Sequence, residues 1–248
     1  VTNPPIDSLR ENKVMSLKTR FGNLGNILDF DNLTEENIYV LDSPILTNSQ
    51  LKKFKKFFSK KVKTIDCTFD IDKSLKDRVD LIREEAETAV REGSTCLVLS
   101  DKNISNQKAS IPSILTVGAV HSHLVKHGLR GYCSLNVECS DAMDTHSFAI
   151  LIGVGATTVN PYLSIDSIYQ RFEKKLFGQY DFETCVKKFK KSIDAGLLKI
   201  MSKMGISVIS SYRGGCNFEA VGLSRAIVSD YFPGMSSRIS GIGIIGIE

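Results

Sequence analysis

From residue 61 onward, short apolar runs alternate with amphipathic stretches, and this alternation constrains the fold more than any other feature of the sequence. Apolar residues at helical spacing predict helices, and short runs rich in β-branched residues predict strands. We predict strands over 61–69, 95–99, 132–138, 157–162 and 206–210, helices over 74–91, 111–127, 145–152 and 182–204, and helical turns over 218–223 and 224–231. Strands that alternate with helices in this way are typical of parallel βαβ units.

The expected fold class is α/β: an incomplete (β/α) barrel-like domain with a mostly parallel sheet, plus an irregular N-terminal extension. The strands are short and apolar, as expected when helices cover both faces of a sheet. Alternation alone does not distinguish a barrel from an open doubly wound sheet. We place the body of the domain over residues 61–248. Residues 1–60 form the extension, with short helices predicted over 7–15 and 47–58.

Composition excludes several classes of protein. The six cysteines form no CxxC pair and lie mostly in apolar runs, which indicates reduced thiols of a soluble intracellular protein. We find no apolar run of the length that a membrane helix needs. The net charge of +4 is weak for a nucleic-acid binder. We therefore expect neither nucleic acid nor membrane as a partner, and cytoplasm and plastid are not distinguished.

The run Lys52–Lys61 mixes basic and aromatic residues, which a nucleic-acid or anionic-membrane surface would also show. An amphipathic helix with its phenylalanines inward and its lysines outward explains the run without a ligand. Acidic residues elsewhere nearly balance the charge, so we favour the amphipathic helix.

Three other motifs have chemical interpretations that remain incomplete. Gly241, Gly243 and Gly246 match GxGxxG, but a dinucleotide site also needs a following helix and a later acidic residue. Cys133 and Cys139 are too few thiolates for an iron–sulfur cluster. On the predicted helix 111–127, His123 and His127 stand four residues apart and could share a metal, while His121 points elsewhere. We favour structural roles for all of them.

Polar residues gather where the predicted strands end, which is where parallel α/β folds bind ligands. They are Ser100, Asp101, Asn136, Glu138, Asn160 and Tyr162, together with Ser211, Tyr212 and Arg213. Strand ends also need polar residues simply to satisfy the backbone, and this interpretation stays open. Spacing alone assigns no catalytic residue.

Blocks along nearly the whole chain resemble the glutamate synthase family, in family order. They are Val1–Asp7, Ser43–Asn48, Leu97–Asp101, Ile111–His121, Asn160–Leu163, Gly196–Ser207, Ser211–Gly214, Phe218–Leu223 and Ser237–Ile242. The resemblance is to the central domain of the large subunit. Since the chain opens on Val1 rather than Met, we expect a piece of a longer protein or a processed product.

The resemblance implies an enzyme whose other domains carry the chemistry. The family converts glutamine, 2-oxoglutarate and a reductant into two molecules of glutamate. Its FMN and three-iron (3Fe-4S) cluster would lie in a neighbouring domain. We therefore expect no cofactor, metal or catalytic residue in this chain. The chain alone would be inactive. The expected partners are the glutaminase and FMN domains of the same polypeptide, with a small subunit or ferredoxin in the full enzyme. The electron donor is not predicted.

The family's central domain helps to wall the ammonia tunnel between the glutaminase and FMN sites. For this chain we expect the lining to include Asn3, Gly22, Asn23, Gly25 and Asn26, because amides and backbone groups can hydrogen-bond ammonia without holding it tightly. These residues could equally serve turn geometry alone.

Two other functions remain open at this point. One is a stand-alone barrel enzyme acting on a phosphorylated small molecule, which would need a phosphate-binding loop near the last two strands. The segment 211–215 is its candidate. The other is a purely structural scaffold.

Overall fold

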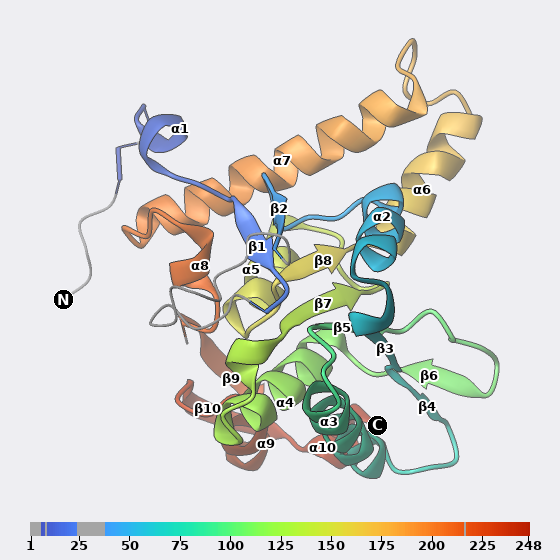
Figure 1. The fold of residues 1–248 in the computed structure, drawn as a ribbon, viewed down its shortest axis with the longest axis vertical. Helices are drawn as coiled ribbons and strands as arrows, with labels where there is room; N and C mark the ends of the chain where they lie inside the picture. Colours follow the sequence, from blue (N-terminus) through green and yellow to red (C-terminus); the bar gives the residue numbers. More distant parts are fainter. Residues whose placement is uncertain (1–5, 8, 24–37, 216) are drawn as a thin grey trace.

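A parallel sheet lies at the centre of the computed structural model, which describes residues 6–7, 9–23, 38–215 and 217–248 (Figure 1). Its strands run in the order β3 (Val62–Asp66), β5 (Cys96–Ser100), β7 (Ser134–Glu138) and β8 (Thr158–Asn160), and each neighbouring pair is parallel. This confirms the predicted α/β fold with a mostly parallel sheet. Within the described part of the chain, the sheet is far short of the eight strands of a closed barrel.

Helices connect the successive strands of this sheet, as the alternation predicted. They are α3 (Leu75–Arg91), α4 (Ser113–Lys126) and α5 (Thr145–Gly153). The side chain of Ser74 caps the first turn of α3 by accepting a hydrogen bond from the backbone N–H of Asp77. Asp144 caps α5 in the same way, through the N–H of Ser147. Both caps stand where the sequence predicted the helices to begin.

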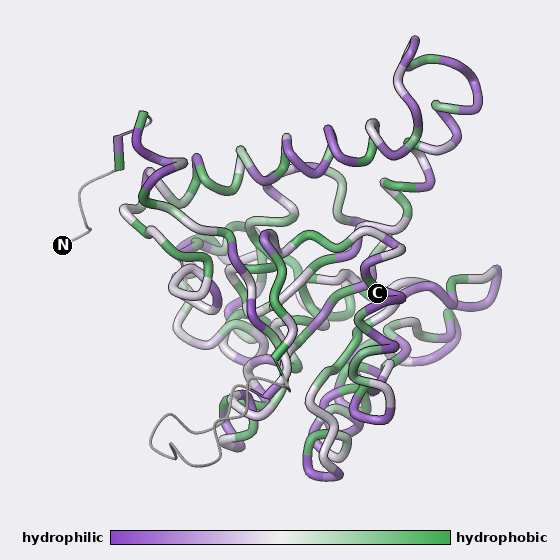
Figure 2. Tube along the Cα trace, turned by 45° about the horizontal axis from the view of Figure 1, so that its top comes forward, coloured by the Kyte–Doolittle hydropathy of each residue, from purple (hydrophilic) through white to green (hydrophobic). Residues whose placement is uncertain are grey.

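Apolar side chains cover both faces of the sheet. Along β5, Leu97 and Leu99 belong to the larger core, which the buried side chains of α3 and α4 share, whereas Cys96 and Val98 belong to a smaller core on the other face. Hydrophobic residues accordingly follow the central strands in Figure 2. This double burial explains why the strands are almost continuously apolar.

The helix α2 (Asn48–Phe58) supplies much of the smaller core. A reciprocal capping box between Thr47 and Gln50 begins it. Phe54 and Phe58 are buried, while the lysines at 52, 53 and 56 are exposed. The basic and aromatic run therefore forms the amphipathic helix that we predicted. Phe57 departs from that pattern, because half of its surface is exposed and its ring packs against Tyr39.

Smaller elements surround the sheet. The strands β1 (Thr19–Phe21) and β2 (Tyr39–Leu41) form one antiparallel pair, and β4 (Thr68–Asp70) and β6 (Lys108–Ser110) form another. The short helices are α1 (Glu11–Val14), η3 (Ser59–Lys61) and η4 (Arg130–Tyr132). The longer α6 (Tyr162–Glu173) and α7 (Phe182–Lys203) are joined by an exposed connection, and α7 extends along one side of the molecule (Figure 1).

The predicted strand over 206–210 and the predicted helical turn over 218–223 are wrong. In the structure, α8 (Ile209–Tyr212) is a short helix, and Val208 only makes an isolated bridge to Ser16. β9 (Glu219–Leu223) is a strand because it pairs in parallel with β10 (Ser236–Ile242), across the predicted helix α9 (Arg225–Tyr231). Such distant pairing leaves no local signal in the sequence.

The glycine-rich end of the described chain is explained by this strand pair. Gly241 lies in β10, and a Cβ atom there would come within 2.3 Å of the carbonyl oxygen of Gly222 in β9. Its lack of a side chain lets the two strands approach. Gly243 precedes α10 (Ile244–Ile247), a helix of a single turn. These contacts agree with a structural role for the GxGxxG match.

The segment before residue 61 contacts the sheet directly. The backbone N–H of Leu46 donates to the carbonyl oxygen of Val159 in β8, at 2.9 Å, and Ile45 bridges to the same residue. The division of the chain into an extension over 1–60 and a body over 61–248 stays a prediction. No helix in the described ranges is long and apolar enough to cross a membrane.

Candidate functional site at the carboxyl edge of the sheet

Each strand of the parallel sheet ends in a polar residue, and the register places these residues in one row. Asp66 pairs with Ser100, Ser100 with Glu138, and Glu138 with Asn160. Three of the four were predicted from their position at strand ends. The row forms the carboxyl edge of the sheet, where parallel α/β folds present their functional groups.

Glu138 is the buried centre of this edge. Its Oε2 accepts a hydrogen bond from the hydroxyl of Ser100 at 2.9 Å and lies 3.4 Å from Nζ of Lys55, while Oε1 lies 2.8 Å from Nζ of Lys102. Burial opposes ionisation of this carboxyl, but the hydrogen bond from Lys102 and the charges of both lysines outweigh it. The pKa of Glu138 is therefore lowered, and the group is a carboxylate.

Asp101 follows the end of β5 and is also buried. Its Oδ2 accepts hydrogen bonds from the hydroxyl of Ser110 at 3.1 Å and from the N–H and hydroxyl of Ser140 at 2.9 and 2.6 Å. Burial and the neighbouring carboxylate of Asp101 raise the pKa of Tyr162. The ammonium group of Lys102 lies over the ring of Tyr162, 5.0 Å from its centroid. The carboxylate thus joins the end of β5 to the last residue of β6 and to the segment after β7.

Two buried oxygen atoms at this edge have no hydrogen-bond partner within the described part of the protein: Oδ1 of Asp101 and Oδ1 of Asn160. The amide nitrogen of Asn160 is satisfied, because it donates to the carbonyl oxygen of Leu46 and to Oδ1 of Asn48. Both free oxygens are acceptors. They can accept hydrogen bonds from N–H or O–H groups, such as those of ammonia or water.

The chemistry of this edge is that of a charged, hydrogen-bonded network. Among the residues that the structure describes, no histidine makes a hydrogen bond to a hydroxyl or a thiol, so no histidine base is paired with a nucleophile there. Lysine ammonium groups stand beside two of the carboxylates: Lys108 beside Asp66, and Lys55 and Lys102 beside Glu138. The edge therefore carries charges of both signs.

Ser211, Tyr212 and Arg213 lie elsewhere, which corrects the prediction that they join the other strand-end residues. Tyr212 donates its hydroxyl to the carbonyl oxygen of Ala149, and Arg213 donates to that of Ala156, before the first residue of β8. They therefore belong to the amino side of the sheet. A barrel's phosphate site needs the opposite side, so the segment 211–215 is not placed to form one.

His121 lies near Arg213, as part of a separate polar cluster. Its Nδ1 accepts a hydrogen bond from Nε of Arg130 at 3.1 Å. Burial lowers the pKa of His121 to about 4, and the charges of Arg130 and Arg213 add to this effect. His121 is thus neutral and points away from His123 and His127, as predicted. Those two meet Glu87 of α3, a neighbour that the sequence did not indicate.

Cys133 and Cys139 do not form part of a shared site. Cys133 precedes β7 and Cys139 follows it, so the five-residue strand separates them by roughly 20 Å. Burial raises the pKa of both thiols. They are therefore protonated, which does not suit a cluster ligand.

Of the predicted tunnel residues, the structure describes Gly22 and Asn23. Gly22 follows β1, is buried and has a φ of +107°, a conformation that favours glycine. Asn3, Gly25 and Asn26 lie outside the described residues. The role of all five in a tunnel stays a prediction.

Comparison with known sequences assigns the chain to a family. Residues 1–224 match the model of the glutamate synthase central domain. The chain belongs to this family. The recognition from sequence blocks is thereby confirmed.

The curated relatives are large chains of which this sequence matches a small part. The large chain of the NADPH glutamate synthase of Azospirillum brasilense is 55% identical over 100% of this chain and 16% of its own length. The large chain of the NADPH glutamate synthase of Bacillus subtilis is 40% identical over 98% of this chain and 16% of its own length. The ferredoxin-dependent glutamate synthase of Pyropia yezoensis is 40% identical over 99% of this chain and 17% of its own length. The chain thus spans about a sixth of these relatives.

Among solved structures, a mutant flavocytochrome b2 with benzoylformate is similar over 67% of this chain and 37% of its own, at 13% sequence identity and a TM-score of 0.46. A likeness at that level supports no argument about function. The fold assignment stands on the parallel sheet itself.

Proposed function

We propose that this chain is the central, connecting domain of a glutamate synthase, and that it helps to wall the path of ammonia between the glutaminase and FMN sites. The reaction of the whole enzyme would convert glutamine, 2-oxoglutarate and a reductant into two glutamates. One observation carries the proposal: the chain matches the relatives over its whole length but spans only 16% of the most similar of those named above. Most of the enzyme's machinery then belongs to other domains.

The physical reason for such a domain is the reactivity of ammonia. In water near neutral pH, ammonia becomes ammonium, which has no lone pair for attack on a carbonyl carbon. An enclosed path keeps bulk water away and preserves the nucleophile. A domain between the two sites can supply the wall of this path. We assign that task to the segment with Asn3, Gly22, Asn23, Gly25 and Asn26.

The cofactors and partners follow from the same assignment. FMN and the 3Fe-4S cluster would be held by a neighbouring domain, in keeping with the separation of Cys133 and Cys139 by β7 in this one. This chain alone would bind neither cofactor and catalyse no step. Its partners are the glutaminase and FMN domains of the same polypeptide, and the full enzyme adds a small subunit or ferredoxin as electron source.

The test compares two routes to glutamate in the full-length protein carrying Gly25→Val. A bulky residue should narrow the path, so glutamine-dependent synthesis should fall. Synthesis from high external ammonium should fall less, because that substrate enters without crossing the path. The rates are measured alongside thermal melting, which reports folding.

Gly178→Val is the matched control. Gly178 has a φ of +62°, a Cβ there meets no atom within 4 Å, and the residue lies in the exposed connection between α6 and α7. Valine at position 178 should strain its own turn without lowering the rate of one route more than that of the other. Equal losses by both routes in Gly25→Val would favour turn geometry over a tunnel.

A further inference from the structure

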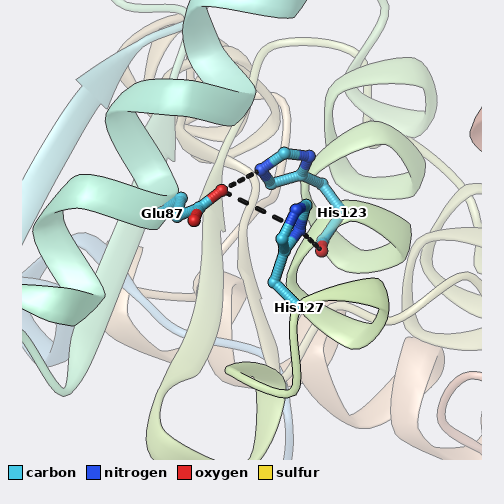
Figure 3. Close-up of side chains that lie close together, drawn as sticks. All are labelled: Glu87, His123 and His127. Carbon is cyan, nitrogen blue, oxygen red and sulfur yellow. Dashed lines mark hydrogen bonds and ion pairs between the residues drawn. The ribbon is translucent and has the colours of Figure 1, made fainter.

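Three side chains from two helices converge outside the carboxyl edge. Oε2 of Glu87, on α3, lies 2.6 Å from Nε2 of His123 on α4 and 3.8 Å from Nδ1 of His127 at the end of α4. One ligand atom from each residue lies within 4.8 Å of the other two. Figure 3 shows the carboxylate facing both imidazoles.

One hydrogen bond fixes the orientation of the His127 ring. Its Nδ1 lies 2.8 Å from the backbone carbonyl oxygen of His123. A carbonyl can only accept, so Nδ1 is the donor of this hydrogen bond. Histidines that bind metals commonly donate their other N–H to a backbone carbonyl, which fixes the ring. Because the nitrogen that faces Glu87 is also Nδ1, a metal held with Glu87 and His123 would replace this hydrogen bond, or would be bound by Nε2 after the ring turns.

Helix geometry adds favourable electrostatics for a cation. Glu87 stands in the last turns of α3, His123 is in the last turn of α4, and the two helices pack side by side. The carbonyl ends of both helices carry partial negative charge. Arg91 opposes a cation, because it lies 2.8 Å from Oε1 of Glu87, but Oε2 remains directed at the histidines.

Space and exposure fit an open coordination site. The side chains of Glu87, His123 and His127 are 22%, 19% and 33% exposed. His123 also lines a surface cavity of about 350 Å³, so water can reach it. Tetrahedral zinc holds its ligand atoms about 3.3 Å apart, so Glu87 and His123 need to separate by only ~0.7 Å.

We propose that Glu87, His123 and His127 form a zinc-binding site that clamps α3 to α4. Two imidazoles and one carboxylate are a ligand set that zinc accepts, and water would complete its coordination. The spacing of His123 and His127 indicated half of this site in the sequence, and only the packing of α3 on α4 adds Glu87. This proposal does not depend on the proposed ammonia path.

Zinc soaked into crystals of the full-length protein tests the site by its position. An anomalous difference map at the zinc absorption edge should show a peak between the three side chains. His123→Gln and Glu87→Gln should abolish this peak. In solution, equilibrium dialysis with Zn²⁺ should show the affinity of this site falling by more than about tenfold in both variants.

The matched control is His146→Gln. His146 is exposed on α5 and takes no part in the cluster, so this variant should keep the peak and the affinity. Circular dichroism checks that every variant is folded. A folded wild-type protein with no anomalous peak here would overturn the proposal and reduce the cluster to an ion pair. Binding that survives His123→Gln would overturn it as well.

Discussion

At the scale of single residues, the carboxyl edge combines what sequence predicts with what only packing supplies. Ser100 and Glu138 were identified from their place at strand ends, because parallel strands bring those ends together. Lys55 was not, although it contacts Glu138 from 83 positions away. A lysine on an amphipathic helix looks solvent-exposed in sequence, and its partner is set by how the helix lies on the sheet.

Glu138→Gln should destabilise the chain in a pH-dependent manner. The pKa of Glu138 is lowered from the ordinary 4.5 in the folded protein, so its contribution to folding is complete above 4.5 and is lost as pH falls through the folded value. We expect a loss of about 1–3 kcal/mol near pH 7 and a smaller difference near pH 3. Urea unfolding of the 248-residue chain at both pH values measures this. A difference independent of pH would contradict the ion-pair account.

Gly155→Ala should be costly because two effects coincide. Gly155 has a φ of +128°, and a Cβ there would come within 2.4 Å of the His121 ring. We expect a loss of at least about 2 kcal/mol in the free energy of unfolding. Gly131→Ala is the control: that site has open space, and we expect a change within about 0.5 kcal/mol. Similar melting temperatures for the two variants would refute this interpretation.

At the scale of elements, the sequence predicted best those helices and strands whose formation depends on residues close to one another in the chain. The helix α3 has a cap at Ser74 and an apolar stripe, and its predicted and observed bounds agree within a residue. The strand β9 has neither signal. It exists because β10 pairs with it, and Gly222 within it has a positive φ of +79° that no strand pattern anticipates. Non-local pairing is what the sequence alone could not supply.

Phe54 and Phe57, three residues apart on α2, should differ sharply in their contribution to the free energy of unfolding. Phe54 is fully buried, with its ring 5.0 Å from that of Phe21 and 5.6 Å from that of Phe58. Phe54→Ala should cost about 3–5 kcal/mol through the cavity it leaves. Phe57→Ala, at a half-exposed position, should cost under about 1 kcal/mol. Denaturant midpoints compare them, and equal losses would mean that α2 does not pack as described.

At the scale of the whole molecule, buried side chains cover both faces of a four-stranded parallel sheet. At the carboxyl edge, Glu138 pairs with two lysines, and the described cysteines are buried. The sequence predicted the fold class and the family. The role of Asn3, Gly22, Asn23, Gly25 and Asn26 in a tunnel stays a prediction, and the structure describes only Gly22 and Asn23 of the five.

The isolated chain should be colourless and inert. Purified from an overexpressing host, it should show no flavin absorbance, contain no iron and hydrolyse no glutamine. Absorbance spectra, iron analysis and a glutaminase assay check the three expectations. Stoichiometric FMN in the preparation would overturn the assignment of the flavin to another domain.

The central claim is that ammonia passes along a path that this domain helps to enclose, and isotope dilution tests it most directly. The full-length enzyme is supplied with glutamine labelled with ¹⁵N in its amide, together with unlabelled ammonium in the solution. The account predicts that the newly formed glutamate keeps the label in the wild-type enzyme and in Gly178→Val. In Gly25→Val, escape of ammonia should dilute the label. Equal dilution in the wild-type enzyme and in Gly25→Val would contradict an enclosed path at this segment.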